Sequence, residues 1–126
     1  MDVKEIMVEG VETIGENDTL ETVLKKSTEE SEGGSLIVEK DGEVVGIVTT
    51  WDILEAIGKR NDLSKIKVKD TMETHIVTVH SDAKVEEAAK EMVDHGVWRL
   101  PVENEGQIVG IISATDILLD KIREIM

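Results

Sequence analysis

The chain has 126 residues, a net charge of −14 and no cysteine, and its only aromatic rings are those of Trp51 and Trp98. These numbers exclude disulfides and thiolate chemistry, and the acidic field and the scarcity of stacking rings oppose nucleic-acid binding. No apolar run is long enough to span a bilayer, and the first residues contain no apolar signal region. We therefore expect a cytoplasmic protein with no membrane partner.

The chain consists of two copies of one pattern. Residues 3–7 resemble residues 68–72, and residues 36–54 resemble residues 100–118, 64 positions later. The copies cover nearly the whole chain, as residues 1–63 and 64–126, and leave little room for another domain.

The first copy predicts a short strand, a helix, a hairpin and a second helix. The first helix begins near Asp18, where the sequence has capping-box chemistry. Strands at 36–38 and 44–48 flank an Asp41-Gly42 turn, which is a strong hairpin signal. The second helix follows the hairpin and reaches its C-cap at Gly58.

The second copy repeats this order. Residues 76–79 are mostly β-branched and predict a strand. A helix ending at Gly96 carries apolar residues at the spacing of one helical face: Val85, Ala88, Ala89, Met92 and Val93. Strands at 99–102 and 108–112 precede a final helix. Pro101 lacks an N–H, so we expect its strand to lie at an edge or a strand end there. The class is mixed α+β, with strand, helix, strand, strand and helix in each copy.

A hydroxyl and a carboxylate lie three residues apart at each predicted strand-to-helix junction, as Thr49 with Asp52 and Ser113 with Asp116. This spacing is that of a capping box. A helix N-terminus also binds anions, and an aspartate beside it can accept two hydrogen bonds from a ribose diol. The structural and the ligand-binding interpretations are compatible.

A glycine precedes each pair inside an apolar strand, at Gly46 and Gly110. Glycine weakens a strand unless something approaches it closely. Close packing of a helix and close approach of a ligand base both explain these positions.

Signatures of catalysis are missing. The chain has no phosphate-binding Gly-rich loop, no Gly-x-Ser-x-Gly and no His-Glu-x-x-His, and its three histidines lack metal-ligand spacing. We therefore predict no catalytic residue and no metal ligand, and we rank an enzyme lowest.

The ordered set of residues 68–72, 76–79, 96–102 and 110–116 resembles a CBS (cystathionine β-synthase) domain, and the first copy resembles one more weakly. The resemblance implies a stand-alone tandem pair of the kind labelled IMP dehydrogenase-related. It implies two pseudo-two-fold β-α-β-β-α repeats packed sheet to sheet, with flanking helices.

The resemblance also implies a non-catalytic regulatory module. Such a module binds an adenosine-containing ligand (AMP, ADP, ATP or S-adenosylmethionine) between the repeats, with or without Mg²⁺, and signals to a regulated protein. It requires no other cofactor, and it implies a homodimer.

Four site residues follow from the resemblance at the helix starts. Asp52 and Asp116 would hold ribose hydroxyls, and Thr49 and Ser113 would lie near ribose or phosphate. The start of each first strand would face the adenine, partly through backbone groups: Val11, Glu12, Ile76 and Val77.

The resemblance also implies that Arg99 would bind a phosphate and that Pro101 would pack against the adenine base. The first copy has Ser35 and Ile37 at these two positions, so the two sites should differ. This loss motivates an alternative function, an interaction or dimerisation scaffold whose nucleotide sites are degenerate. Ligand binding separates the two hypotheses.

Overall fold

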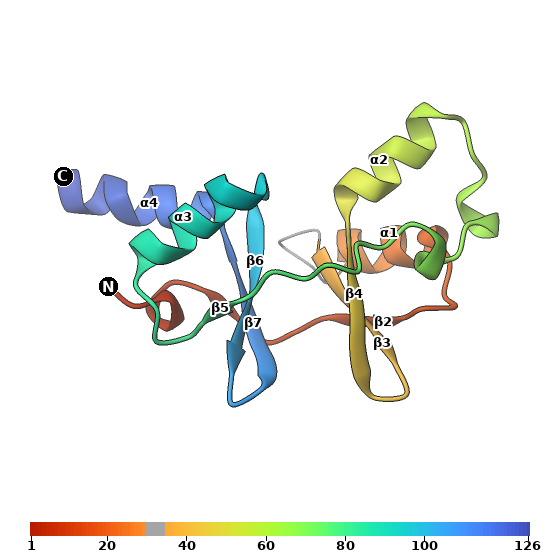
Figure 1. The fold of residues 1–126 in the computed structure, drawn as a ribbon. Helices are drawn as coiled ribbons and strands as arrows, with labels where there is room; N and C mark the ends of the chain where they lie inside the picture. Colours follow the sequence, from red (N-terminus) through yellow and green to blue (C-terminus); the bar gives the residue numbers. More distant parts are fainter. Residues whose placement is uncertain (30–34) are drawn as a thin grey trace. The chain divides into compact units, whose positions relative to one another are not determined.

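The computed structural model describes residues 1–29 and 35–126 and divides into two compact units (Figure 1). One unit comprises Glu12–Ile76 and is called the 12–76 unit. The other combines Met1–Val11 with Val77–Met126 and is called the 77–126 unit. The two units are described separately.

The 12–76 unit contains a three-stranded sheet in the order β2-β3-β4, with β2 parallel to β3 and β3 antiparallel to β4. Its elements are β2 (Thr13–Gly15), α1 (Leu20–Glu29), β3 (Ser35–Lys40), β4 (Glu43–Thr49), α2 (Thr50–Gly58) and the 3-10 turns η2 (Leu63–Lys65) and η3 (Val68–Asp70).

The 77–126 unit contains a four-stranded sheet in the order β1-β7-β6-β5. Its elements are the 3-10 turn η1 (Val3–Glu5), β1 (Val8–Glu9), β5 (Val79–His80), α3 (Val85–His95), β6 (Arg99–Asn104), β7 (Gln107–Ser113) and α4 (Ala114–Ile125).

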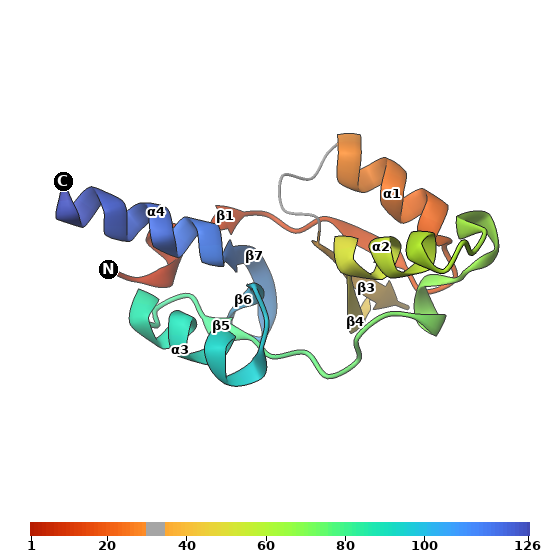
Figure 2. The ribbon, with the colours of Figure 1, turned by 90° about the horizontal axis from the view of Figure 1, so that it is seen from above.

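Side chains along each strand point alternately to the two faces of the sheet, and the helices cover the face that carries the buried apolar side chains. Leu100 and Ile112 are cross-strand partners and belong to one core cluster with Ala88 of α3 and Ile117 of α4. Figure 2 shows α3 and α4 running beside each other. Because side chains alternate along a strand, Arg99 and Ser113 belong to the opposite face of the sheet.

The 12–76 unit follows the same rule. Leu36 and Val48 are partners and lie in a core cluster with Val23 of α1 and Ile53 of α2. Ser35 and its partner Thr49 belong to the opposite face.

The opening segment of each repeat packs in the unit built mainly from the other repeat. Val3 is fully buried in the core of the 77–126 unit, and Val68 is fully buried in the core of the 12–76 unit. The compact units therefore do not coincide with the two sequence copies. The repeat boundaries at 1–63 and 64–126 remain a prediction about the duplication.

These opening segments explain Gly46 and Gly110. A Cβ on Gly110 would lie 2.6 Å from the Val8 carbonyl oxygen, because β1 pairs with β7 there. A Cβ on Gly46 would lie 2.6 Å from Met72 Sδ and 3.0 Å from the Glu73 carbonyl oxygen. The close approach comes from a neighbouring chain segment and not from a helix, so the expected helix contact was wrong, and the glycines need no ligand contact to explain them.

The C-cap predicted at Gly58 was wrong, because Gly58 is the last residue of α2 and Lys59 is the C-cap. The predicted hairpin turn and the predicted end of α3 are confirmed. Asp41 and Gly42 both adopt positive φ, 52° and 81°, as a tight hairpin requires. Gly96 ends α3 in the left-handed conformation, with φ 64°.

Two predictions in the second copy were wrong. The strand expected at 76–79 is only Val79–His80, because Pro101 of the neighbouring β6 has no N–H with which to extend the ladder. Val93, expected on the buried face of α3, is 81% exposed. The face is narrower than the spacing suggested, and its fully buried members are Val85 and Ala88.

Gly110→Ala should destabilise the protein by about 1–3 kcal/mol, since the added methyl group meets a backbone oxygen that cannot move without shifting β1. Gly46→Ala should cost less, because its closest contact is the flexible Met72 thioether. Urea unfolding of the two variants measures the difference.

Gly58→Ala is the control. A Cβ on Gly58 meets nothing within 4 Å, so alanine should leave stability unchanged or raise it through helix propensity. Equal losses for Gly110→Ala and Gly46→Ala would contradict the backbone-contact explanation.

Candidate functional site

The junction of β7 and α4 forms a complete capping box. The Ser113 N–H donates to Asp116 Oδ2 at 2.9 Å, and the Asp116 N–H donates to Ser113 Oγ at 3.1 Å. Ser113 has extended backbone dihedrals, as an N-cap residue should. The sequence therefore starts the helix with its own hydroxyl and carboxylate.

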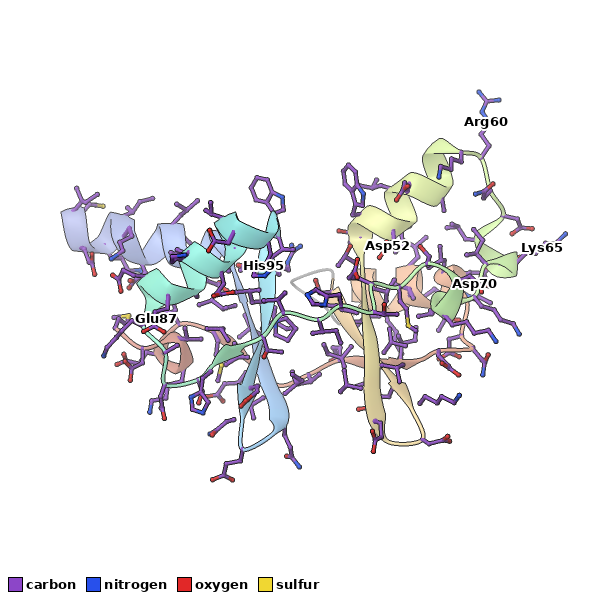
Figure 3. The ribbon with its side chains drawn as sticks, viewed as in Figure 1. Asp52, Arg60, Lys65, Asp70, Glu87 and His95 are labelled. Atoms are coloured by element: carbon purple, nitrogen blue, oxygen red, sulfur yellow. The ribbon has the colours of Figure 1, made fainter. Side chains whose placement is uncertain are left out.

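The junction of β4 and α2 repeats this arrangement. The Thr49 N–H donates to Asp52 Oδ2 at 2.9 Å, and Figure 3 shows Asp52 where β4 leads into α2. Both predicted pairs thus lie at helix N-termini, one pair in each unit.

Each capping carboxylate keeps unused acceptor capacity. A carboxylate has about four lone-pair sites; among the described residues Asp116 accepts one hydrogen bond, at Oδ2, and Asp52 accepts from the N–H and the hydroxyl of Thr49. Both side chains are half-buried rather than enclosed. The capping interpretation is confirmed. The capping role leaves acceptor capacity at each helix N-terminus, so it does not conflict with the ligand-binding interpretation, which stays a prediction.

The electrostatic setting of Asp52 is unfavourable to charge. Burial raises the pKa of Asp52 above its ordinary value, and the negative charges of Glu55 and Glu73 add to the rise. The hydrogen bonds from Thr49 act in the opposite direction and are outweighed. The Asp52 carboxylate at this junction lies in a negative local field.

Arg99 lies beside the Ser113–Asp116 junction. It is the cross-strand partner of Ser113, so their side chains stand on the same face with Cβ atoms about 5 Å apart. Its Nε is buried and has no hydrogen-bond partner among the described residues. A guanidinium with an unused donor next to a helix N-terminus is suited to an anion.

Pro101 changes the adjoining strand ladder. In the 12–76 unit the Ile37 N–H donates to the Glu12 carbonyl oxygen at 3.0 Å. Pro101 and Val77 occupy the corresponding positions of the second copy, and Pro101 has no N–H. Within the described chain, no hydrogen bond reaches the Val77 carbonyl oxygen, which is left as a free acceptor beside the proline ring.

Ser35 is a site residue that the sequence prediction missed. It pairs with Thr49 as Arg99 pairs with Ser113, it is only 6% exposed, and its Oγ has no partner among the described residues. The alignment of the two copies placed Ser35 at the Arg99 position and was the available signal.

The structure thus groups the predicted residues into two sets, which we call half-sites. The 77–126 half-site contains Val77, Arg99, Pro101, Ser113 and Asp116. The 12–76 half-site contains Glu12, Thr49 and Asp52, with Ser35 added.

Val11 and Ile76 are not placed beside these helix starts. The Gly10 N–H donates to the Val109 carbonyl oxygen, so Val11 follows a point of β7 remote from Ser113. Ile76 is the last residue of the 12–76 unit and lies three positions after Glu73, which pairs with Ile47. Their adenine contacts remain predictions.

The CBS domain model matches this chain over residues 3–59 and 68–120. The chain belongs to the CBS domain family. The two matched segments correspond to the two sequence copies, and the tandem arrangement with four α-helices and two small sheets agrees with the predicted fold class.

Solved CBS domain pairs have the same fold. The pair of protein MJ0100, in complex with 5′-methylthioadenosine and S-adenosyl-L-methionine, is 25% identical, with a TM-score of 0.87 and 98% of both chains covered. A hexameric CBS-CP12 protein from bloom-forming cyanobacteria is 31% identical, with a TM-score of 0.87, over 94% of this chain and 71% of that chain.

Among curated proteins, a homoserine O-acetyltransferase of Methanococcoides burtonii is 35% identical over 91% of this chain and 23% of its own length. The chain spans between 23% and 41% of the first three curated relatives that it matches. In the described part of the chain, no helix combines the length and apolar character needed to cross a membrane.

The raised pKa of Asp52 predicts a specific pH dependence of stability. Because the folded state holds this proton more tightly than the unfolded state, the contribution of Asp52 should fall as pH rises through the raised pKa. The unfolding free energy of the wild type minus that of Asp52→Asn should therefore decrease from acidic to neutral pH. Urea unfolding across this range measures it.

Asp94→Asn is the matched control with the opposite sign. The hydrogen bond and charge of Lys90 lower the pKa of Asp94, so its contribution is present above the ordinary aspartate pKa and is lost as pH falls. If the free-energy difference between wild type and variant changes with pH in the same direction for Asp52→Asn and Asp94→Asn, burial does not raise the pKa of Asp52.

Proposed function

We propose that this chain is a non-catalytic regulatory module that binds an adenosine-containing ligand and signals the bound state to a partner protein. AMP, ADP, ATP and S-adenosylmethionine are the candidate ligands, with or without Mg²⁺. The observation that carries the proposal is the pair of helix N-termini, each holding a half-buried capping carboxylate with unused acceptor capacity.

The geometry suits the sugar of a nucleoside. Two neighbouring ribose hydroxyls can both donate to one carboxylate, and Asp116 presents its free Oδ1 beside the unpaired N–H groups of the first turn of α4. The same N–H groups and the free donor of Arg99 suit a phosphate attached to that sugar.

The 77–126 half-site also has groups that suit an adenine ring. The free Val77 carbonyl oxygen can accept from the exocyclic amine of the base. The apolar Pro101 ring belongs to the same strand face as Arg99. The adenosine derivatives bound by the CBS domain pair of protein MJ0100 support this ligand class.

A regulatory rather than a catalytic role is supported by how the relatives are matched. Enzyme names occur among relatives of which this chain covers 21–24%, and the sequence has none of the catalytic motifs considered above. A ligand regulates by binding one conformation more tightly than another. The two half-sites supply the differential contacts for such a shift.

Isothermal titration calorimetry with each candidate ligand, with and without Mg²⁺, tests the proposal. Asp116→Ala should weaken binding at the 77–126 half-site about 10- to 100-fold, the effect of losing hydrogen bonds to a charged group. Asp94→Ala, an exposed aspartate of α3, should leave binding unchanged.

If none of the candidate ligands gives heat or a thermal shift with the wild type, the adenosine proposal is wrong and the scaffold alternative takes its place. Equal effects of Asp116→Ala and Asp94→Ala would remove Asp116 from the site.

We also propose that the chain forms a homodimer through its helices. The outer face of α4 exposes Leu118, Leu119 and Ile122. Beside it, a groove of about 480 Å³ between α3 and α4 is lined almost entirely by apolar side chains, including Met92 and Trp98. A second copy would cover this surface, and two-fold dimers are the commonest soluble assembly.

Leu118→Glu should dissociate the dimer, because it buries a charge in an apolar contact. Sedimentation should then change from twice 13.9 kDa to 13.9 kDa. Val44→Glu makes the same charge change on the exposed β3–β4 hairpin and should leave the dimer intact. If the wild type sediments as a monomer at a protein concentration of about tens of micromolar, which is on the order of ordinary assay concentrations, the homodimer proposal is wrong.

A further inference from the structure

The two half-sites differ in charge at one equivalent position of their sheets. Arg99 pairs with Ser113 in the 77–126 unit, and Ser35 pairs with Thr49 in the 12–76 unit. Directly opposed residues of antiparallel strands stand on the same face, with Cβ atoms about 5 Å apart. Arg99 and Ser35 therefore neighbour the hydroxyl that caps each helix.

Among the described residues, Arg99 is a cation without a carboxylate partner. The chain has 28 acidic and 14 basic side chains, and in the described part seven lysines form ion pairs with carboxylates: Lys4, Lys25, Lys40, Lys59, Lys84, Lys90 and Lys121. Among the described residues Arg99 has no such partner, and its buried Nε donates to nothing. The guanidinium remains charged in proteins, so a bound anion would supply the missing partner.

Ser35 offers only a neutral hydroxyl at the same place. Its Oγ is buried without a partner in the described part of the chain. Asp52 lies at the adjoining helix start, and the charges acting on it are those of Glu55 and Glu73, both negative. Lys26 of α1 reaches the Thr13 carbonyl oxygen, to which its Nζ donates at 3.0 Å, so that amine is already engaged.

We propose that the half-sites select adenosine ligands that differ in charge at the 5′ position. The 77–126 half-site takes a 5′-phosphate, which Arg99 and the α4 N-terminus neutralise. The 12–76 half-site takes a neutral thioether or a cationic sulfonium, because among the described residues the charges that act at its helix start are negative and Ser35 replaces the arginine. This inference rests on the proposed function and assigns a ligand class to each half-site.

The two half-sites can bind the nucleoside in the same way and still select different groups at the 5′ position. Both half-sites present a capping carboxylate that can accept further hydrogen bonds, so the ribose contacts can be alike. Only the group attached to the sugar meets Arg99 in one half-site and Ser35 in the other. Discrimination then comes partly from repulsion of the wrong ligand, as in other specific sites.

AMP and 5′-methylthioadenosine are the probes, since they share the nucleoside and differ in the charge of the 5′ group. Calorimetry uses full-length variants in which one half-site is silenced. Asp52→Ala, which retains the 77–126 half-site, should prefer AMP by about tenfold or more. Asp116→Ala, which retains the 12–76 half-site, should prefer 5′-methylthioadenosine.

Arg99→Ser in the Asp52→Ala background should then weaken AMP binding about 10- to 100-fold and change 5′-methylthioadenosine binding little. Arg123→Ser is the matched control, because Arg123 is exposed in the last turn of α4. It should change neither affinity.

Glu73→Gln gives an independent measurement at the other half-site. Glutamine can still accept the hydrogen bond that the His75 N–H donates to Glu73, so the fold should be retained. Removing this charge in the Asp116→Ala background should strengthen AMP binding a few-fold without affecting 5′-methylthioadenosine.

The same ligand ranking at both half-sites, or equal effects of Arg99→Ser and Arg123→Ser on AMP, would overturn the charge selection while leaving adenosine binding intact. If the wild type binds neither probe and no other adenosine ligand, the proposed function fails, and the selection fails with it.

Discussion

The structure depends on the close approach of each opening segment to a glycine of a central strand. At Gly110 the main chain of β1 comes so near β7 that no side chain fits between them. At Gly46 residues 72–73 occupy the corresponding place beside β4. The approach fixes the path that brings Val3 and Val68 into the two cores, and it explains why glycine lies three residues before each capping hydroxyl without any ligand.

Local features were predictable from the sequence because their causes are local. The Asp41-Gly42 turn, the end of α3 at Gly96 and the capping pair Ser113–Asp116 each depend on residues within four positions of one another.

Features that join distant parts of the chain were not predictable in this way. Nothing local in residues 1–11 says that they pack with residues 77–126, which follow more than 60 positions later in the chain. The truncation of β5 comes from Pro101 on another strand, and the orphaned hydroxyl of Ser35 depends on burial by the folded sheet. The apolar periodicity of α3 also predicted that Val93 is buried, whereas it is exposed. Periodicity shows which residues share a helix face, but it does not show how much of that face the rest of the unit covers.

The exchange of opening segments has a consequence for how such a chain can arise. A single copy of the repeat cannot supply its own sheet with the segment that packs against its glycine, because that segment comes from the neighbouring copy. An ancestor with one repeat would therefore complete its sheet only by exchanging this segment with a second molecule, as in a domain-swapped dimer. Joining two copies in one gene makes the exchange intramolecular and independent of protein concentration. By the same logic, residues 12–76 form a continuous stretch with a complete core, whereas a cut between the two sequence copies separates each sheet from the strand or turn that covers it.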